Sequence, residues 1–341
     1  PELVITNSRP GEGIRIFPGG PDGPDPSKYS VINGASGAVV ETGDFNRDGW
    51  LDLLIIGFVY DDTEESLNNS TKVFYGSKDG YSPDNMQILP TYTKAAGVLA
   101  DTNRNGYSDF VFFDMRKFIG VYPGGPDGFD VEKLIKYPFD MFQGHRMCVT
   151  DVADFNGDGW PDLLITIMGH YARVPAGFAI AYGGPDGYSM DRCVFKDMGM
   201  SPDGVDIADL NNNGYLDLIV TAYSTKDTRE LPCQIFFGSE NGLDLDNPRK
   251  IMANSSAACF TVDLNGNGYK DLILVCHRDN LSHFVDSRVY RNGPDGISDD
   301  YFALPGMGPS YAASRGLGNQ LDRSPHEYYI SVPYEMNGKL K

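Results

Sequence analysis

The chain has 341 residues, including 40 glycines and 22 prolines, and its formal net charge is −19 at pH 7. This frequency of turn-forming residues, with 41% hydrophobic and 22% charged residues, indicates a turn-rich β protein with a large core and excludes a disordered chain. The negative charge argues against a nucleic-acid-binding protein, and no apolar run reaches the roughly 18 residues of a membrane span.

Short apolar runs bounded by Gly, Asn and Asp follow one another along the chain and predict β-strands. They fall into repeats of four strands, for example at 97–100, 108–114, 118–124 and 131–137. In this repeat a loop beginning at Asp101 joins the first two strands, and a GPDG turn joins the last two. No stretch of helical length shows a sustained period of 3.6 residues, so the sequence predicts an all-β fold.

Two motifs mark the repeat. The first reads DFNRDGWLDLLI in its first copy and recurs at intervals of 53 to 57 residues, beginning at Asp44, Asp101, Asp154, Asp209 and Asp263. The second alternates with it, as IFPGGPDG, FYGSKDG, VYPGGPDG, AYGGPDG, FFGSENG and VYRNGPDG. Two motifs on one period indicate that the same four-stranded unit is built several times.

The second strand of the repeat gives the number of units. It occurs seven times, beginning at Glu2, Asp52, Asp109, Asp162, Asp217, Asp271 and, more weakly, Glu327. We therefore predict one domain over residues 1–341, a seven-bladed β-propeller of four-stranded antiparallel blades whose chain ends share a closing blade. Six or eight blades remain open, and a solenoid is the alternative architecture.

The Asp-rich motif predicts an oxygen-lined loop between the first and second strands of a blade. Side-chain oxygens stand at positions 1, 3, 5 and 9, position 7 offers its backbone carbonyl, and glycine at position 6 permits a sharp turn. Oxygen ligands at this spacing suit Ca²⁺, and the strand after position 9 excludes an EF-hand. The predicted ligands of about five structural Ca²⁺ ions are Asp44, Asn46, Asp48, Trp50, Asp52, Asp101, Asn103, Asn105, Tyr107, Asp109, Asp154, Asn156, Asp158, Trp160, Asp162, Asp209, Asn211, Asn213, Tyr215, Asp217, Asp263, Asn265, Asn267, Tyr269 and Asp271.

Asx-rich turns that hold no metal are the alternative interpretation of these loops. The last blade departs from the pattern, so we expect no ion there. Its residues at the corresponding positions are Asn319, Leu321, Arg323, Pro325 and Glu327.

The repeat resembles the FG-GAP/VCBS repeat of integrin α-subunit propellers and of many bacterial secreted proteins, over about residues 1–335. The resemblance implies calcium-binding blades and a secreted protein, extracellular or periplasmic. A chain that starts at Pro1 fits a trimmed secreted protein. We expect a monomer.

The antiparallel strands divide the connections between two faces. The Asp-rich loops and GPDG turns lie on one face, and the connections that do not repeat lie on the other, where binding sites are usually found. These connections hold four of the five histidines and ten of the 28 basic residues, which predicts a site for an anionic ligand. The candidate catalytic residues are His145, Arg146, His170, Tyr171, Arg173, His277, Arg278 and Tyr311.

Two classes of function fit these residues. The first is a polysaccharide lyase that cleaves an anionic, uronic-acid glycan by β-elimination, similar to the propeller-fold ulvan and rhamnogalacturonan lyases, whose sites also use His, Tyr and Arg. An arginine would stabilise the carboxylate and the enolate, a neutral histidine would be the base, and a tyrosine would be the acid. In that order the candidates are Arg146, Arg173 or Arg278; His145 or His170; and Tyr171 or Tyr311. The second class is a non-catalytic lectin or adhesion module that binds a glycan or a protein.

Other metal chemistry has less support in the sequence. Zn²⁺ bound by some of His145, His170, His277 and His283 with a cysteine is the less favoured alternative, because no short His/Cys spacing motif is present. The five cysteines show no CxxC pairing and are expected to be buried, with one disulfide left open. They are Cys148, Cys193, Cys233, Cys259 and Cys276.

Overall fold

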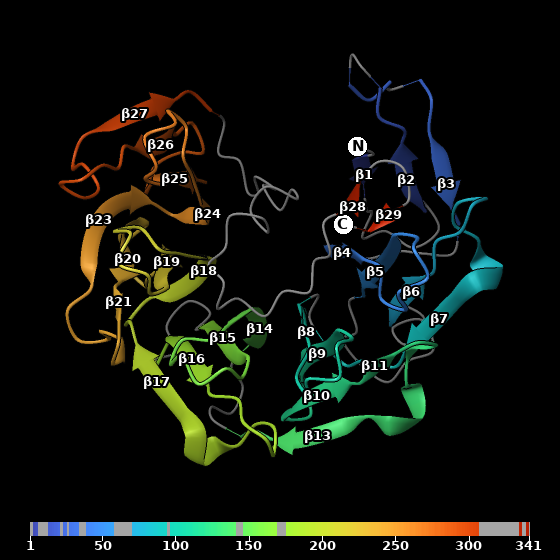
Figure 1. Cartoon of the computed structure of the whole chain (residues 1–341). Helices are drawn as coiled ribbons and strands as arrows, with labels where there is room; N and C mark the ends of the chain where they lie inside the picture. Colours follow the sequence, from blue (N-terminus) through green and yellow to red (C-terminus); the bar gives the residue numbers. More distant parts are fainter. Residues whose placement is uncertain are drawn as a thin grey trace. The chain divides into compact units, whose positions relative to one another are not determined.

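The structure is a computed structural model, and it describes residues 3–5, 13–20, 23–25, 27–33, 39–57, 70–93, 96–140, 146–168, 175–306, 334–335 and 339–340. The chain divides into two compact units, one of Pro1–Asp140 with Tyr329–Lys341 and one of Met141–Tyr328. Both units are built of β-strands (Figure 1). In the described ranges the helices are three single 3-10 turns, and none is long and apolar enough to cross a membrane.

The first unit contains three of the repeated sheets. The three-stranded sheet starts with the second strand of the repeat, in the order β1 (Leu3–Ile5), β2 (Ile14–Phe17) and β3 (Ser30–Ile32). The next sheet has the order β4 (Val39–Gly43), β5 (Asp52–Ile56), β6 (Thr71–Phe74) and β7 (Met86–Leu89). The third has the order β8 (Val98–Ala100), β9 (Asp109–Asp114), β10 (Phe118–Tyr122) and β13 (Ile135–Pro138). Two short hairpins are β11 (Gly124–Gly125) with β12 (Gly128–Phe129), and β28 (Tyr334–Glu335) with β29 (Lys339–Leu340).

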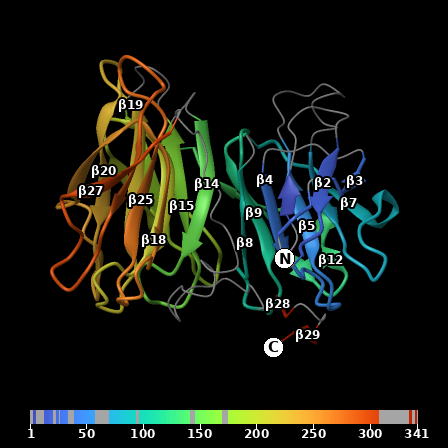
Figure 2. The ribbon, with the colours of Figure 1, turned by 90° about the horizontal axis from the view of Figure 1, so that it is seen from above.

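The second unit contains three four-stranded sheets, whose strands run antiparallel to their neighbours (Figure 2). The first has the order β14 (Arg146–Ala153), β15 (Asp162–Met168), β16 (Gly177–Ala181) and β17 (Cys193–Asp197). The second has the order β18 (Ser201–Ala208), β19 (Asp217–Ser224), β20 (Glu230–Phe236) and β23 (Arg249–Asn254). The third has the order β24 (Ser256–Val262), β25 (Asp271–Cys276), β26 (Ser287–Tyr290) and β27 (Tyr301–Leu304), and a short hairpin pairs β21 (Gly238–Ser239) with β22 (Gly242–Leu243).

The second strand of each four-stranded sheet is buried on both faces, which explains its continuous apolar sequence. In β5, Leu53 and Ile55 pack against the three-stranded sheet, whereas Leu54 and Ile56 pack against the sheet that contains β9. Successive residues of a strand point to opposite faces, so a strand between two other sheets has no solvent face that would need polar residues. Within each unit, the repeat therefore gives neighbouring sheets with an apolar layer between them.

One predicted strand is partly wrong. Residues 131–137 begin with the 3-10 turn η2 (Val131–Lys133), and the strand β13 starts only at Ile135. The Asp130 carboxylate accepts a hydrogen bond from the Glu132 amide at 3.2 Å, so the side chain supplies a local partner that favours a turn over a ladder. The other two turns, η1 (Pro83–Asn85) and η3 (Met190–Arg192), also directly precede the fourth strand of a sheet.

The cysteines form no disulfide. All five are free thiols; four are buried and Cys193 is half-buried. Burial raises the pKa of the Cys193 thiol to about 12 and raises those of Cys233, Cys259 and Cys276 as well. The expectation of buried small hydrophobic side chains is confirmed for four of the five cysteines, and the disulfide left open by the sequence is absent.

Candidate functional site

The loop between the first two strands of each four-stranded sheet is wound around side-chain oxygens. We call these segments the aspartate loops and number them one to five: 44–52, 101–109, 154–162, 209–217 and 263–271. In loop one, Asp44 accepts hydrogen bonds from the amides of Asp48 at 3.0 Å and Gly49 at 2.9 Å. The same Asp48 amide donates to the Asn46 side-chain oxygen at 3.1 Å, so the oxygens of positions 1 and 3 lie beside one N–H group.

This arrangement recurs in every aspartate loop. In loops two to five, the amide at position 5 again donates to the side-chain oxygens of both position 1 and position 3. The carboxylate at position 1 also accepts from the amide of the position 6 glycine, at 2.8 Å in each of these four loops. The repeated spacing in the sequence therefore produces one repeated cage of oxygens.

The backbone reaches this geometry through two left-handed residues. Position 6 is glycine throughout, with φ between 86° and 94°. Position 4 is also left-handed, although it is Arg47, Arg104 or Asn212 in loops one, two and four, with φ between 56° and 60°. A left-handed backbone carries a steric cost for residues other than glycine. The hydrogen bonds of the loop therefore keep Arg47, Arg104 and Asn212 in a backbone conformation that these residues seldom adopt.

The aspartate at position 9 joins the two sequence motifs. This residue is fully buried in all five loops and lies at the first position of the second strand. Its Oδ1 accepts a hydrogen bond of 2.7 to 2.9 Å from the amide of the turn between the third and fourth strands; the donors are Gly76, Gly124, Gly183, Gly238 and Asn292. Within each sheet the aspartate loop and this turn therefore lie at the same end, as the sequence predicts.

Buried carboxylates in these loops are held in an unfavourable environment. Burial raises the pKa of Asp52 to about 7; hydrogen bonds from the amides of Gly76 and Phe45 oppose the shift, and the carboxylates of Asp48 and Asp44 add to it. Burial likewise raises the pKa of Asp162 to about 8 and of Asp217 to about 7, and it raises that of Asp109. A cation at each loop would stabilise the ionised form of these groups.

The donor set fits a hard cation that accepts neutral oxygen ligands. Among the residues that the structure describes, no group of three or more His, Cys, Asp or Glu side chains is arranged as a metal site. The loops offer Asn oxygens and the position 7 carbonyl as well as carboxylates, which is a mixture that Ca²⁺ accepts. The first four loops share this set, whereas in loop five an arginine contacts the position 9 aspartate.

Neighbouring aspartate loops are also connected. The Arg47 guanidinium of loop one donates to the carbonyl of Gly106 in loop two and lies over the Tyr107 ring, 4.9 Å from its centroid. In the second unit, the Asn212 amide group of loop four donates to the Gly268 carbonyl of loop five at 3.0 Å. Both contacts run from position 4 of one loop to position 6 of the next, so the left-handed position 4 directs its side chain to the adjacent sheet.

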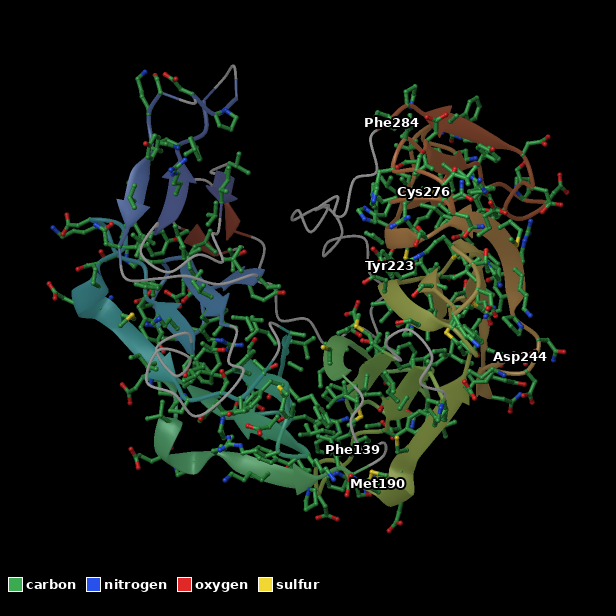
Figure 3. The ribbon with its side chains drawn as sticks, turned by 180° about the vertical axis from the view of Figure 1, so that it is seen from behind. Phe139, Met190, Tyr223, Asp244, Cys276 and Phe284 are labelled. Carbon is green, nitrogen blue, oxygen red and sulfur yellow. The ribbon has the colours of Figure 1, made fainter. Side chains whose placement is uncertain are left out.

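At the opposite ends of β19 and β25, four side chains form what we call the histidine cluster: Tyr223, Arg229, His277 and His283. Arg278 follows His277 in the chain, and its Nε donates to the Asp279 carbonyl at 3.3 Å. The ring centroids of Tyr223 and His277 are 5.7 Å apart and stacked, and those of His277 and His283 are 4.8 Å apart at 74°. The Arg229 guanidinium lies 4.6 Å from the centroid of the Tyr223 ring. Figure 3 shows Tyr223, Cys276 and Phe284 on the same side of the second unit.

The cluster is held by two residues of neighbouring loops. Ser255, buried and left-handed with φ of 43°, accepts from the His277 amide at 3.1 Å, donates from its own amide to the Arg229 carbonyl at 2.6 Å, and donates from Oγ to the Tyr223 carbonyl. Asn280 accepts from the Arg229 amide at 2.7 Å through its side-chain oxygen. A non-glycine residue kept left-handed by three such contacts is a strained position of the kind found at binding sites.

The charge of the two loops that carry the cluster is mixed. Lys226, Arg229 and Arg278 stand in loops 225–229 and 277–286 together with Asp227, Asp279 and Asp286. Asp279 is committed to its own loop, because its carboxylate accepts from the amides of Leu281 and Ser282 at 2.8 and 2.7 Å. These two loops therefore do not show the positive excess that the sequence predicts for this face.

The structure covers only part of the predicted catalytic set. His277 and Arg278 are both described; His277 lies in the cluster together with His283, whereas the Arg278 side chain contacts the Asp279 carbonyl. Outside the described residues lie His145, His170, Tyr171, Arg173 and Tyr311, and Arg146 is described only as the first residue of β14. The zinc alternative likewise depends on His145 and His170. The sequence analysis did not identify Tyr223 or Ser255 as site residues. Tyr223 lies near the end of a second strand that continues to Ser224, and Ser255 stands between two strands; neither position belongs to a repeated motif.

No family model matches the sequence, and no curated protein matches it either. A crystal structure of BBS1N in complex with ARL6DN, soaked with mercury, is similar in fold: the TM-score is 0.51 at 11% identity, over 90% of this chain and 77% of that chain. The biofilm matrix protein Bap1 of V. cholerae matches with a TM-score of 0.41 at 13% identity, over 81% of this chain and 40% of that chain. The first similarity, together with the repeated four-stranded antiparallel sheets, supports an all-β fold of the β-propeller class.

Proposed function

We propose that the chain is a secreted, carbohydrate-active β-propeller, a polysaccharide lyase that cleaves a uronic-acid glycan at the histidine cluster. The observation that carries this proposal is the contact of Tyr223, His277 and His283 at one end of the second unit, beside Arg229. Arg278 is the next residue in the chain after His277. A phenol, two imidazoles and guanidinium groups are the side chains that β-elimination from a uronate requires.

The proposed reaction needs one base, one acid and one anion-stabilising group. A guanidinium, Arg278 in the first instance, pairs with the C6 carboxylate of the uronate and stabilises the enolate. A neutral imidazole, His277 or His283, removes the C5 proton, and the electron pair forms the C4–C5 double bond as the bond from C4 to the leaving oxygen breaks. The Tyr223 hydroxyl supplies a proton to that oxygen. The predicted residues His145, Arg146, His170, Tyr171, Arg173 and Tyr311 remain candidates to complete the site.

The aspartate loops have a structural role in this proposal. Loops one to four would each hold one Ca²⁺ through their position 1, 3, 5 and 9 side chains and the position 7 carbonyl, which closes the hairpin between the first two strands. We further propose one ring of seven blades over residues 1–341, a monomer, with the histidine cluster on the face opposite the aspartate loops.

A non-catalytic glycan- or protein-binding module is the second candidate, and one observation favours it. Leu281 is 93% exposed and Phe284 is 74% exposed in the loop that carries His283. Exposed apolar side chains beside a polar cluster provide contact area for a bound partner. They have no role in the proton transfers of the proposed β-elimination.

The test is an assay of the full chain with ulvan, pectin, alginate and glycosaminoglycans. Lyase activity produces a conjugated double bond, seen as rising absorbance near about 235 nm, and His277→Gln is expected to lower the rate by about 100-fold or more with an unchanged melting temperature. Asp227→Asn, an exposed change in the neighbouring loop, is the control and should leave the rate unchanged. A flat trace with glycan binding that His277→Gln abolishes would select the binding module, and the absence of both would refute the carbohydrate proposal.

A further inference from the structure

Loop five differs from the other four at the residue that precedes the turn amide. In loops one to four the amide that donates to the position 9 aspartate follows Tyr75, Pro123, Tyr182 or Phe237, none of which carries charge at neutral pH. In loop five the corresponding residue is Arg291. The VYRNGPDG motif thus places a cationic side chain where its counterparts place a neutral one.

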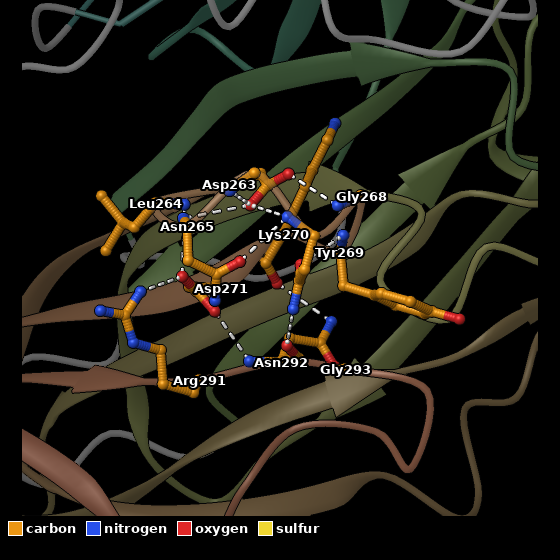
Figure 4. Close-up of polar contacts among 12 residues, drawn as sticks. Asp263, Leu264, Asn265, Gly268, Tyr269, Lys270, Asp271, Arg291, Asn292 and Gly293 are labelled. Atoms are coloured by element: carbon orange, nitrogen blue, oxygen red, sulfur yellow. Dashed lines mark hydrogen bonds and ion pairs between the residues drawn. The ribbon is translucent and has the colours of Figure 1, made fainter.

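The guanidinium of Arg291 contacts the buried aspartate directly. Its Nη1 donates to Oδ2 of Asp271 at 2.7 Å (Figure 4). Asp271 is fully buried, whereas the Arg291 side chain is 40% exposed. Among the described residues, this is the one ion pair that involves a position 9 aspartate. The guanidinium carbon also lies 5.2 Å from the centroid of the Phe302 ring, which packs against it from β27.

The ion pair changes the hydrogen bonds of the same carboxylate. Oδ2 accepts from the Leu264 amide at 3.3 Å in loop five, whereas the corresponding amides, for example those of Phe45 and Phe155, donate at 2.8 Å. In loop five, Oδ2 thus accepts from the arginine as well as from a more distant position 2 amide. A charge-assisted hydrogen bond is stronger than one between neutral groups, which accounts for the longer distance to the amide.

The turn itself is fixed by a second substitution. Asn292 stands where loops one to four have glycine, and its side-chain Nδ2 donates to the carbonyls of Leu210 at 2.7 Å and Lys270 at 3.0 Å. Asn292 is buried, so these contacts hold the backbone next to Arg291 in one position. The arginine is thus directed at Asp271 by its neighbour as well as by Phe302.

We propose that Arg291 takes the place of a metal ion at loop five, so that the chain binds four Ca²⁺ ions and not five. The inference rests on the proposed calcium role of the other loops. The guanidinium supplies Asp271 with the positive charge that the position 9 aspartates of loops one to four would receive from Ca²⁺. A divalent cation entering loop five would meet the repulsion of the guanidinium, which lies at the carboxylate that the cation would need.

The experiment is calcium titration calorimetry on the full chain after dialysis against a chelator. The wild type is expected to bind four ions, and Arg291→Gln is expected to bind five, because glutamine removes the positive charge beside Asp271. Pro123→Arg, which puts an arginine at the matching position beside Asp109, is expected to bind three. Arg249→Gln removes the half-buried arginine that pairs with the exposed Asp299, neither of which belongs to an aspartate loop, and should still bind four. Pro123→Arg decides the matter if Arg291→Gln does not fold.

The number of bound ions distinguishes a failure of the arginine substitution at loop five from a failure of the calcium role of the other loops. Five ions in the wild type, four in Arg291→Gln, or no loss in Pro123→Arg would overturn the inference while leaving calcium in the other loops. No ion in the wild type would refute the calcium role of every loop, and the inference with it. Melting curves in chelator give a second readout: Arg291→Gln should melt below the wild type there and recover in calcium.

Discussion

Gly124 shows how closely the turn after the third strand approaches the aspartate loop of its own sheet. A Cβ added at this residue would overlap the carbonyl oxygen of Ser108, and the same collision with backbone occurs at Gly76, Gly183 and Gly238. The adjacent Gly125 is open, with its nearest atom, the Gly128 carbonyl oxygen, at 3.9 Å. In loops one to four, the glycine that donates to the position 9 aspartate therefore has no room for a side chain, whereas its neighbour Gly125 in loop two has room.

Gly124→Ala is expected to lower the free energy of unfolding by about 2 kcal/mol, because backbone on both sides must move to admit one methyl group. Gly125→Ala, the matched control, should change it by less than about 0.5 kcal/mol. Urea unfolding of the two variants measures the difference. Equal effects would contradict the close approach between turn and loop.

At the scale of the element, the aspartate loop and its hairpin form the repeating unit, and Asp162 is the buried position 9 carboxyl of loop three. Its pKa of about 8 means that the metal-free chain carries this group largely protonated at pH 7. Asparagine is therefore close in charge to the group that it replaces, but it cannot ligate a cation as a carboxylate does.

Asp162→Asn is accordingly expected to cost about 1 kcal/mol in chelator, since an amide nitrogen replaces one of two acceptor oxygens. In calcium the variant should bind one ion fewer and lose more stability than it loses in chelator. Asp186→Asn, at an exposed turn of the same sheet, is the control. Equal losses in the two buffers would show that loop three takes no ion.

The elements were predictable from the sequence to the extent that they repeat. Asp52, Asp109 and Asp162 begin their strands where the motif places them, because burial on both faces makes each second strand one apolar run. The turn at Val131–Lys133 was not predictable in this way, since a single capping aspartate decides it.

The histidine cluster was predictable only in part, for a different reason. The contacts that fix it join Ser255 to Tyr223 and Asn280 to Arg229, across 32 and 51 residues of sequence, and such contacts occur once and leave no period. Arg291 was visible as the one arginine in its motif, but its role needed the distance to Asp271. Sequence periodicity identifies the residues that all the sheets have in common. The residues of the candidate site occur in one sheet or loop only, so periodicity does not identify them.

At the scale of the molecule, the titration of buried carboxyls gives the metal-free chain an unusual pH dependence. Asp52, Asp162 and Asp217 have folded pKa values of about 7 to 8, above the unfolded value of 3.8, so the folded state binds more protons between these limits. Stability must then fall as the pH rises through this window. The formal charge of −19 at pH 7 acts in the same direction through repulsion.

In chelator, the melting temperature is therefore expected to fall from pH 5 to pH 8. Calcium should raise it, and most strongly at pH 8, because the ion stabilises the ionised carboxylates of the folded state. Differential scanning fluorimetry at pH 5, 6, 7 and 8 in both buffers measures this. A melting temperature in chelator that rises over the same range would contradict the environment assigned to these aspartates.

The free cysteines lie in β14, β17, β20, β24 and β25, all in the unit Met141–Tyr328. Since alkylating reagents attack exposed thiolates, these side chains react slowly until the strands that carry them separate. The rate at which each cysteine is alkylated, followed by mass spectrometry, thus reports how fast the sheet that carries it opens. No engineered probe is needed.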